Sequence, residues 1–164
     1  MPEERDPGEH RERLLLGLRA FAGAYAELTR SFAGWLGLHA TDARALVEIL
    51  TAEDGGVPLS PARLAERLGL SSGATATLLN RLEDAGYVVR SREHADRRVV
   101  TVRAHATIAP AARDYFTPLA RRLDAMLAGY RDEDLARSGD LLADLETTMA
   151  AVLADAAARP PREA

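Results

Sequence analysis

Several residue types are absent from this chain or scarce in it, and each gap excludes a class of protein. The 164 residues contain no cysteine, which excludes disulfide bonds, thiolate catalysis, iron–sulfur clusters and zinc ribbons. Aromatic residues make up only 5% of the chain, and alanine and leucine supply most of its 47% hydrophobic residues. A β-sandwich needs valine, isoleucine and aromatics, so this composition favours helices. We predict a mostly α protein.

Long apolar runs are also missing. No stretch approaches the roughly 18 apolar residues that a membrane span needs. The first residues, Met1 to Asp6, are charged where a secretory signal peptide turns apolar. We therefore expect a cytoplasmic protein without a membrane partner.

The N-terminal part of the chain predicts one long helix. Residues 1–9 are charged and contain prolines and a glycine, so we expect a disordered arm and structure from about His10. From Arg11 to Leu36, apolar residues recur every three or four positions and give one helical stripe. Three glycines within it each weaken the helix by about 1 kcal/mol relative to alanine. We expect packing within the chain or against a second subunit to hold it.

Start and stop signals for two further helices follow. Thr41 or Asp42 can cap a second helix that stops before Asp54. Ser60, followed by proline at the first helical position, begins a short third helix, and Gly69 ends it.

A fourth helix can begin at a cap on Ser71 or Ser72 and run to Ala85, where Gly86 stops it. It follows the third helix so closely that the two predict a helix-turn-helix. On a helical wheel, one face is apolar and is expected to pack inward: Ala74, Leu78, Leu79, Leu82 and Ala85. The opposite face is small and hydrogen-bonding: Gly73, Ala76, Thr77 and Asn80. Such a face allows close approach to base edges, although it also fits an inert surface.

After Gly86 the pattern changes to β-branched residues. Residues 87–92 and 98–103, with a polar stretch between them, predict a β-hairpin. Pro110 can then start a fifth helix, and Asp132 can cap a sixth that carries a long apolar face as far as Leu153.

Charge is unevenly distributed along the chain. The net charge is −4 overall, which argues against a nonspecific nucleic-acid coat. Residues 60–103, however, hold eight arginines and five acidic residues, a net of +3, against −7 for the remainder. Five of those arginines lie in the hairpin. One interpretation is a solvated β-ribbon whose charged side chains protect its edge from aggregation. Because the hairpin follows a helix-turn-helix, we favour the interpretation that its arginines contact a DNA backbone or minor groove.

Three runs of residues resemble the MarR family of winged helix-turn-helix regulators: Leu68–Ala74 (LGLSSGA), Leu78–Val88 (LLNRLEDAGYV), and Arg92 with Asp96–Val100 (DRRVV). The order of elements is similar from about Leu14 to Leu153, whereas the specific motif covers Leu64 to Val102. One departure is Ala104–Ile108, where typical members have a Leu-Thr-x-x-Gly segment; it leaves the start of the fifth helix in doubt.

The resemblance implies a homodimer whose first and last two helices form the dimerisation region. It also implies that Ser71–Asn80 enters the major groove and that Asp96 orients the wing arginine Arg98. A two-fold dimer places its recognition helices about 34 Å apart, so the operator should be a pseudo-palindrome. The expected DNA contacts are Ser71, Ser72, Gly73, Ala76, Thr77, Asn80, Arg81, Arg92, Asp96, Arg97 and Arg98.

The expected organisation is therefore mostly α with a small β-hairpin wing. Its segments are an arm (1–9), an N-terminal dimerisation helix (10–40), a winged helix-turn-helix lobe (41–106) with recognition helix 71–85 and wing 87–103, C-terminal dimerisation helices (107–158) and a frayed tail (159–164).

An effector site is a further hypothesis. Tyr25, Phe32 and Trp35 recur at helical spacing, and His39 follows. Residue by residue, packing of these rings in the core is the plainer interpretation. The MarR resemblance implies a small aromatic or phenolic ligand near the junction of the dimerisation region and the lobe, with Arg19 and His39 as partners for its acid group.

Two other classes of function compete with a ligand-responsive repressor. An enzyme is disfavoured because the four histidines are scattered and no phosphate loop or nucleophile elbow is present. His94 and His105 could hold a metal across the hairpin, but solvated side chains are the simpler interpretation; we expect no cofactor. The other competitor is a winged-helix module that binds a protein instead of DNA.

Overall fold

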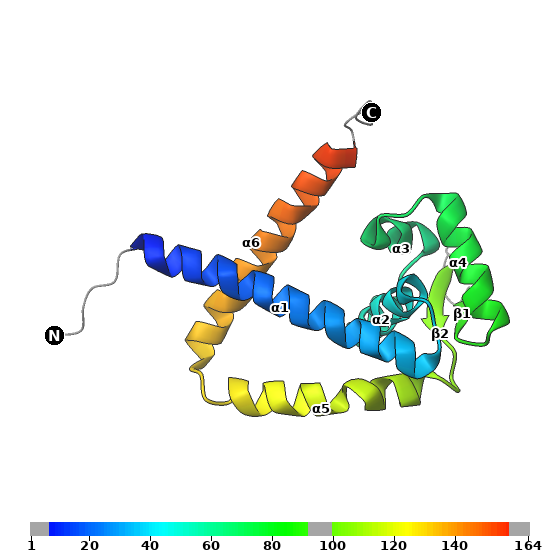
Figure 1. Ribbon diagram of the computed structural model, residues 1–164, viewed down its shortest axis with the longest axis horizontal. Helices are drawn as coiled ribbons and strands as arrows, with labels where there is room; N and C mark the ends of the chain where they lie inside the picture. Colours follow the sequence, from blue (N-terminus) through cyan, green and yellow to red (C-terminus); the bar gives the residue numbers. More distant parts are fainter. Residues whose placement is uncertain (1–6, 92–99, 158–164) are drawn as a thin grey trace. The chain divides into compact units, whose positions relative to one another are not determined.

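The computed structural model of the protein describes residues 7–91 and 100–157. These residues form six helices and one two-stranded antiparallel sheet, as Figure 1 shows. Their bounds are α1 (Pro7–Leu36), α2 (Ala40–Asp54), α3 (Pro61–Leu68), α4 (Ser72–Asp84), β1 (Val88–Ser91), β2 (Thr101–Ala104), α5 (Ala109–Leu127) and α6 (Asp132–Ala157). The predicted fold class, mostly α with a small hairpin, is confirmed.

The chain divides into two compact units, Met1–Tyr115 and Phe116–Ala164. The first unit contains α1 to α4, the hairpin and the beginning of α5, and the second contains the rest of α5 and all of α6. α1, which covers most of the predicted N-terminal dimerisation helix over 10–40, packs on α2 within the first unit and buries Phe32 and Ala33 there.

Two helix starts differ from the expected ones. α1 begins at Pro7, not His10, because proline is well placed in a first helical turn, where its missing N–H would have no partner. α2 begins at Ala40 after His39, whose side chain makes no capping hydrogen bond. Thr41 and Asp42 therefore lie inside α2, and Asp42 is buried.

The starts predicted for the helix-turn-helix are confirmed. Ser60 caps α3 by accepting a hydrogen bond from the backbone N–H of Arg63 at 3.3 Å. Ser71 caps α4 in the same way, with the N–H of Ala74 at 3.2 Å. Gly69 ends α3 in the left-handed conformation, with φ of 68°, which glycine adopts without a steric penalty.

The inward face of α4 is rotated slightly from the expected one. Ala74 and Ala85 are exposed, and Thr75 is buried in their place with Leu78, Leu79 and Leu82. A buried hydroxyl is costly without a partner, but that of Thr75 donates to the carbonyl of Ser71 at 3.0 Å. This local bond allows Thr75 to be buried on a face for which the sequence predicted only apolar side chains.

The hairpin is short and is joined by a third segment. Val88 pairs with Ala104 at one end of the ladder and Ser91 with Thr101 at the other. Leu59, just before α3, forms an isolated bridge with Val102, whose N–H donates to the Leu59 carbonyl at 2.8 Å. This bridge anchors the hairpin beside the start of the helix-turn-helix.

One apolar core holds the first unit together. Every helix from α1 to α4 and both strands contribute buried side chains, and the largest fully buried apolar ones are Phe32, Leu46, Ile49, Leu64, Leu79, Leu82, Val88 and Val102. At about 1.5–3 kcal/mol for each such side chain, this burial is the main stabilising contribution to the unit.

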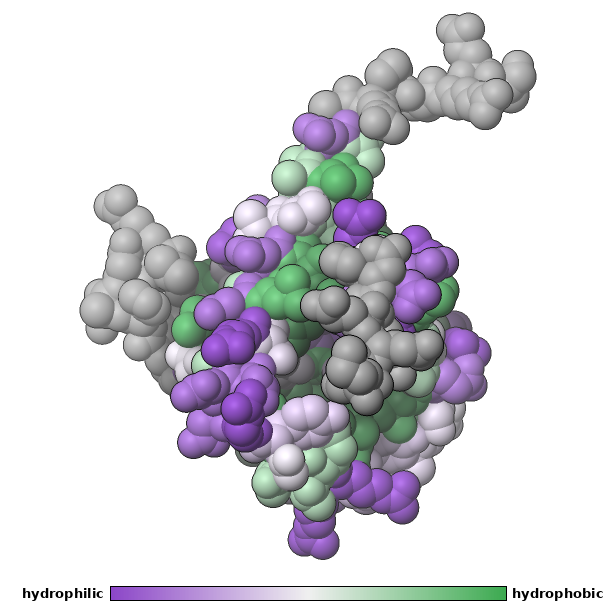
Figure 2. Space-filling model, turned by 90° about the vertical axis from the view of Figure 1, so that its left-hand side faces the viewer, coloured by the Kyte–Doolittle hydropathy of each residue, from purple (hydrophilic) through white to green (hydrophobic). Residues whose placement is uncertain are grey.

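The second unit has a different character. α6 begins at Asp132 itself, one residue earlier than a helix capped by Asp132 would begin. None of the described side chains from 116 to 156 is buried, and several large apolar ones are well exposed: Met126, Leu127, Tyr130, Leu141, Leu142, Met149, Val152 and Leu153. Figure 2 shows apolar residues, in green, at the surface of the face that it views. No described helix is long and apolar enough to cross a membrane.

Candidate nucleic-acid interface

The outer side of α4 carries the small polar face that the sequence predicted. Ser71, Ser72, Gly73, Ala76, Thr77 and Asn80 are all exposed. The Thr77 hydroxyl donates to the carbonyl of Gly73 at 3.1 Å, so both lone pairs of its oxygen remain available to other donors. Because Gly73 and Ala76 project little beyond the backbone, another surface can approach this helix closely.

Arg81 was expected to contact DNA, and the structure gives its guanidinium a partner within the protein. Its Nε donates to one carboxylate oxygen of Asp42 at 2.8 Å and its Nη2 donates to the other at 2.5 Å. The Asp42 side chain is 2% exposed, and that of Arg81 is 51% exposed. Hydrogen bonding to the carboxylate, with its charge, raises the pKa of Arg81 above its usual value.

This bidentate pair joins α4 to α2 through two residues that are 39 positions apart in the sequence. Asp42 was predicted to cap a helix, and no signal in the sequence indicates that it pairs with Arg81. A carboxylate at the third position of α2 has no local reason to be buried, so only the tertiary structure reveals that Asp42 pairs with Arg81.

Asn80 also has a partner, on β1. Its Oδ1 accepts a hydrogen bond from Nη2 of Arg90 at 2.7 Å. Arg90 is bound in turn to Glu83 of α4, through its backbone N–H at 3.3 Å and through an ion pair between its Nη1 and Glu83 Oε2. One arginine of the hairpin therefore fixes the side chain of a residue predicted to read bases.

The remaining predicted contacts, Arg92, Asp96, Arg97 and Arg98, lie outside the described residues, as does His94. Arg90 and Arg103 belong to the described strands of the same hairpin. His105, which follows β2, places its Nδ1 2.7 Å from the hydroxyl of Thr107. Among residues 7–91 and 100–157, no group of three or more potential ligands could hold a metal ion.

The residues predicted for an effector occupy different surroundings. Phe32 is fully buried, and Trp35 is 54% exposed. Both rings contact Tyr115, with centroid distances of 5.1 Å and 5.2 Å, and the Tyr115 hydroxyl lies 2.8 Å from the oxygen of Ser31. The sequence pattern did not indicate Tyr115, because it is 80 residues or more from its ring partners and helical periodicity relates only near neighbours.

Tyr25 instead stacks near Phe21, with ring centroids 6.2 Å apart. Both rings line a groove of about 550 Å³ between α1 and α2, together with Arg30, Arg44 and Glu48 among others. Burial raises the pKa of the Tyr25 hydroxyl, and the nearby negative charge of Glu48 adds to the shift. His39 is exposed ahead of α2.

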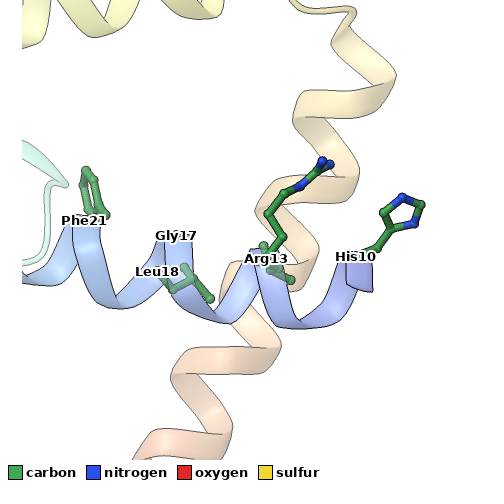
Figure 3. Close-up of a pocket in the computed structure, with 6 residues that line it drawn as sticks. His10, Arg13, Gly17, Leu18 and Phe21 are labelled. Carbon is green, nitrogen blue, oxygen red and sulfur yellow. The ribbon is translucent and has the colours of Figure 1, made fainter. Parts of the chain in front are cut away.

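Arg19 lines a hollow with other residues of α1 only. A second such hollow, of about 530 Å³, is shown in Figure 3 with His10, Arg13, Leu18 and Phe21 around it. One helix cannot enclose a small molecule by itself, so neither hollow is a ligand site as it stands. Arg19, Tyr25 and the Phe32–Trp35 pair therefore lie in three different surroundings.

Comparison with known proteins adds independent information about this chain. Residues 36–99 match the model of the MarR family. HTH-type transcriptional regulator YcgE of Bacillus subtilis, itself uncharacterized, is 35% identical over 100 residues, which cover 61% of this chain. The match spans 62% of the length of that relative.

Solved structures share the fold at low sequence identity. FabT of Streptococcus pneumoniae, in a complex with DNA, is 22% identical with a TM-score of 0.57 over 87% of this chain and 99% of its own. NadR, in a complex with 4-hydroxyphenylacetate, is 23% identical with a TM-score of 0.58 over 88% and 96%. MepR of S. aureus, in a DNA-binding conformation, is 10% identical with a TM-score of 0.62 over 83% and 98%. The fold and the matched segment agree with the sequence motifs: residues 36–99 of this chain match the MarR family, and the chain shares its fold with winged helix-turn-helix regulators.

Proposed function

We propose that this protein is a sequence-specific DNA-binding transcriptional regulator and that α4 is its recognition helix. The observation that carries the proposal is the exposed face of α4, small at Gly73 and Ala76 and hydrogen-bonding at Thr77 and Asn80. A helix of this kind fits the major groove, which is wide enough to admit it. The net charge of +3 over residues 60–103 supplies the attraction to phosphates that an acidic chain otherwise lacks.

The regulator acts as a homodimer in this proposal. Support comes from the exposed apolar residues of α1, α5 and α6, which a second copy could cover. Two-fold symmetry would place the recognition helices about one turn of DNA apart, so the operator would be a pseudo-palindrome.

The regulator is also proposed to be a repressor that a small aromatic or phenolic acid releases from DNA. The half-exposed Trp35 beside Phe32 and Tyr115 offers an aromatic surface for such a ligand. NadR, which shares the fold, is described with 4-hydroxyphenylacetate. A ligand that binds the DNA-free form more tightly must weaken DNA binding by the same coupling factor, typically about 5- to 150-fold.

Selection of bound fragments from genomic DNA tests DNA recognition directly. We expect enrichment of an inverted repeat and binding that weakens steeply with salt. Arg98→Ala should weaken binding to all sequences and reduce the salt slope by about one unit per wing. Absence of any enriched sequence, together with a salt-insensitive interaction with a protein, would favour a protein-binding module instead.

Titration of salicylate-like and phenolic compounds tests the effector. Trp35 fluorescence and operator binding are followed in the same samples, because Trp35 is the only tryptophan of the chain. A fluorescence change with weaker DNA binding is the expected result. If neither response appears across a broad panel of compounds, these rings have a purely structural role.

A further inference from the structure

Asn80 lies where the exposed face of α4 meets the first strand of the hairpin. α4 packs against β1, and Asn80 is an exposed residue on the third turn of α4. Its Oδ1 accepts a 2.7 Å hydrogen bond from Nη2 of Arg90. The side chain predicted to read a base is therefore held by a second element.

Arg90 is itself held in place. Both oxygens of the Glu83 carboxylate are used: Oε1 accepts from the Arg90 backbone N–H at 3.3 Å, and Oε2 pairs with Nη1. The Arg90 and Glu83 side chains are only 32% and 36% exposed. Because Glu83 lies three residues after Asn80 on the same helix, the carboxylate and the amide are neighbours that share one guanidinium.

The chemistry of this contact determines which way the amide of Asn80 faces. A guanidinium has only donors, so the amide must turn its oxygen, and not its nitrogen, toward Arg90. The Nδ2 group, with two N–H donors, is the part left available to DNA. An unrestrained asparagine typically reads adenine by accepting from N6 and donating to N7.

A positive charge beside Oδ1 changes that preference. Adenine would have to bring its N6 donor next to the Arg90 guanidinium, where two donors face the same oxygen. Guanine presents two acceptors, O6 and N7, to the major groove, and both are attracted to the Asn80 N–H groups and the adjacent cation.

We propose that Arg90 is a positioning residue that makes Asn80 select guanine over adenine at one position of each half-site. The inference rests on the proposed DNA-binding function and adds to it the base that this pair recognises and the residue that sets the choice.

Selection from randomised half-sites, followed by affinity measurements on duplexes with each base at the selected position, tests the inference. Asn80→Ala identifies the position, because the preference there should flatten. The wild-type protein should prefer guanine over adenine there by about tenfold, the usual range for one specific base contact. Arg90→Ala should remove this preference or turn it toward adenine, whereas Arg90→Lys, which keeps a charged donor, should retain it.

Arg63→Ala is the matched control for loss of one cation. Arg63 is 74% exposed on α3 and pairs only locally with Glu66 at 2.9 Å. Its removal should lower affinity for all sequences by a similar factor and leave the base preference unchanged.

Asn80→Asp provides a second test, in which the hydrogen bond from Arg90 to residue 80 is kept. Aspartate still accepts from Arg90 but offers DNA an acceptor in place of the Nδ2 donors, so the preference should move from guanine to cytosine, whose N4 group donates. Thermal melts of each variant confirm that the lobe is folded.

The outcomes separate the two proposals. A wild-type protein that enriches no sequence overturns the proposed function, and this inference with it. A wild-type protein that selects an operator, with an unchanged guanine preference in folded Arg90→Ala, overturns the inference alone. So does an Asn80→Ala variant that flattens no position.

Discussion

The two units of the chain differ in how they use their apolar residues. The unit up to Tyr115 buries Leu46, Ile49, Leu64 and other large side chains almost completely. In the unit from Phe116 onward, the described side chains are intermediate or exposed, although Leu142, Met149 and Leu153 are as apolar as those of the first unit.

This difference indicates which unit is structurally self-sufficient. A lobe that binds DNA must hold its recognition helix in a fixed conformation. The closed core of the first unit does this within a single chain. A two-helix unit with exposed leucines loses the free energy that their burial would provide, about 1.5–3 kcal/mol for each large apolar side chain. The comparison therefore favours a second copy of the chain as the partner of α6.

The largest effect is expected from charging the exposed face of α6. The double substitution Leu142→Asp and Leu153→Asp should abolish dimerisation, because it would bury two carboxylates in the proposed interface. Light scattering should then give the chain mass of 17.7 kDa in place of about twice that value. Glu146→Gln, on the same helix, is the control and should leave the dimer intact. A double variant that stays dimeric would place the interface elsewhere.

The next largest effect is expected in the closed core of the first unit. Leu46→Ala should lower the free energy of unfolding of the lobe by about 2–5 kcal/mol, because Leu46 is fully buried and the cavity cannot collapse completely. Denaturant unfolding measures this loss. Leu142→Ala is the comparison: in dilute protein it should change the unfolding of the lobe by about 0.5 kcal/mol or less. Equal losses for the two variants would remove the distinction between the units.

The ion pair between α2 and α4 should respond asymmetrically. Arg81→Ala leaves the buried carboxylate of Asp42 without its partner, whereas Asp42→Ala leaves a half-exposed guanidinium that water can solvate. Arg81→Ala should therefore destabilise the lobe more than Asp42→Ala does. Thermal melts at neutral pH compare the two, and the reverse order would show that the pair contributes mainly through the arginine.

The smallest effect concerns Tyr25 in the groove between α1 and α2. Its pKa is raised above the ordinary value of 10.0, first by burial and then by Glu48. The unfolded chain therefore ionises this hydroxyl at lower pH than the folded chain does, so stability is lost as the pH rises above about 10. Ultraviolet titration should show a phenol that ionises late in the wild-type protein and is missing from Tyr25→Phe. An unchanged titration in that variant would contradict the assignment.

The sequence predicted the fold well where local signals decide it. Ser60 and Ser71 as caps and Gly69 as a stop depend on nearby backbone groups, and β-branched residues favour strands by themselves. The structure agrees at each. The starts of α1 and α2 were predicted less well. Pro7 can either break or begin a helix, and Asp42 can either cap one or be buried in it; only tertiary packing decides between these.

The candidate site was predictable in composition but not in pairing. The small outer face of α4 follows from helical periodicity, so Gly73, Ala76, Thr77 and Asn80 could be identified in advance. The bonds from Arg81 to Asp42 and from Arg90 to Asn80 join separate elements, which no periodicity relates. For the same reason Tyr115 was missed beside Phe32 and Trp35.

The central claim is that the lobe is stable by itself but binds DNA only when a second chain covers the exposed apolar face of α6. The most direct test is the number of protein chains bound to a selected operator. Light scattering of the complex at micromolar protein gives the number of chains per duplex. We predict two chains on each inverted repeat, and parallel loss of dimer and of operator affinity in the Leu142→Asp, Leu153→Asp variant. A folded monomer that binds the inverted repeat with full affinity would contradict it.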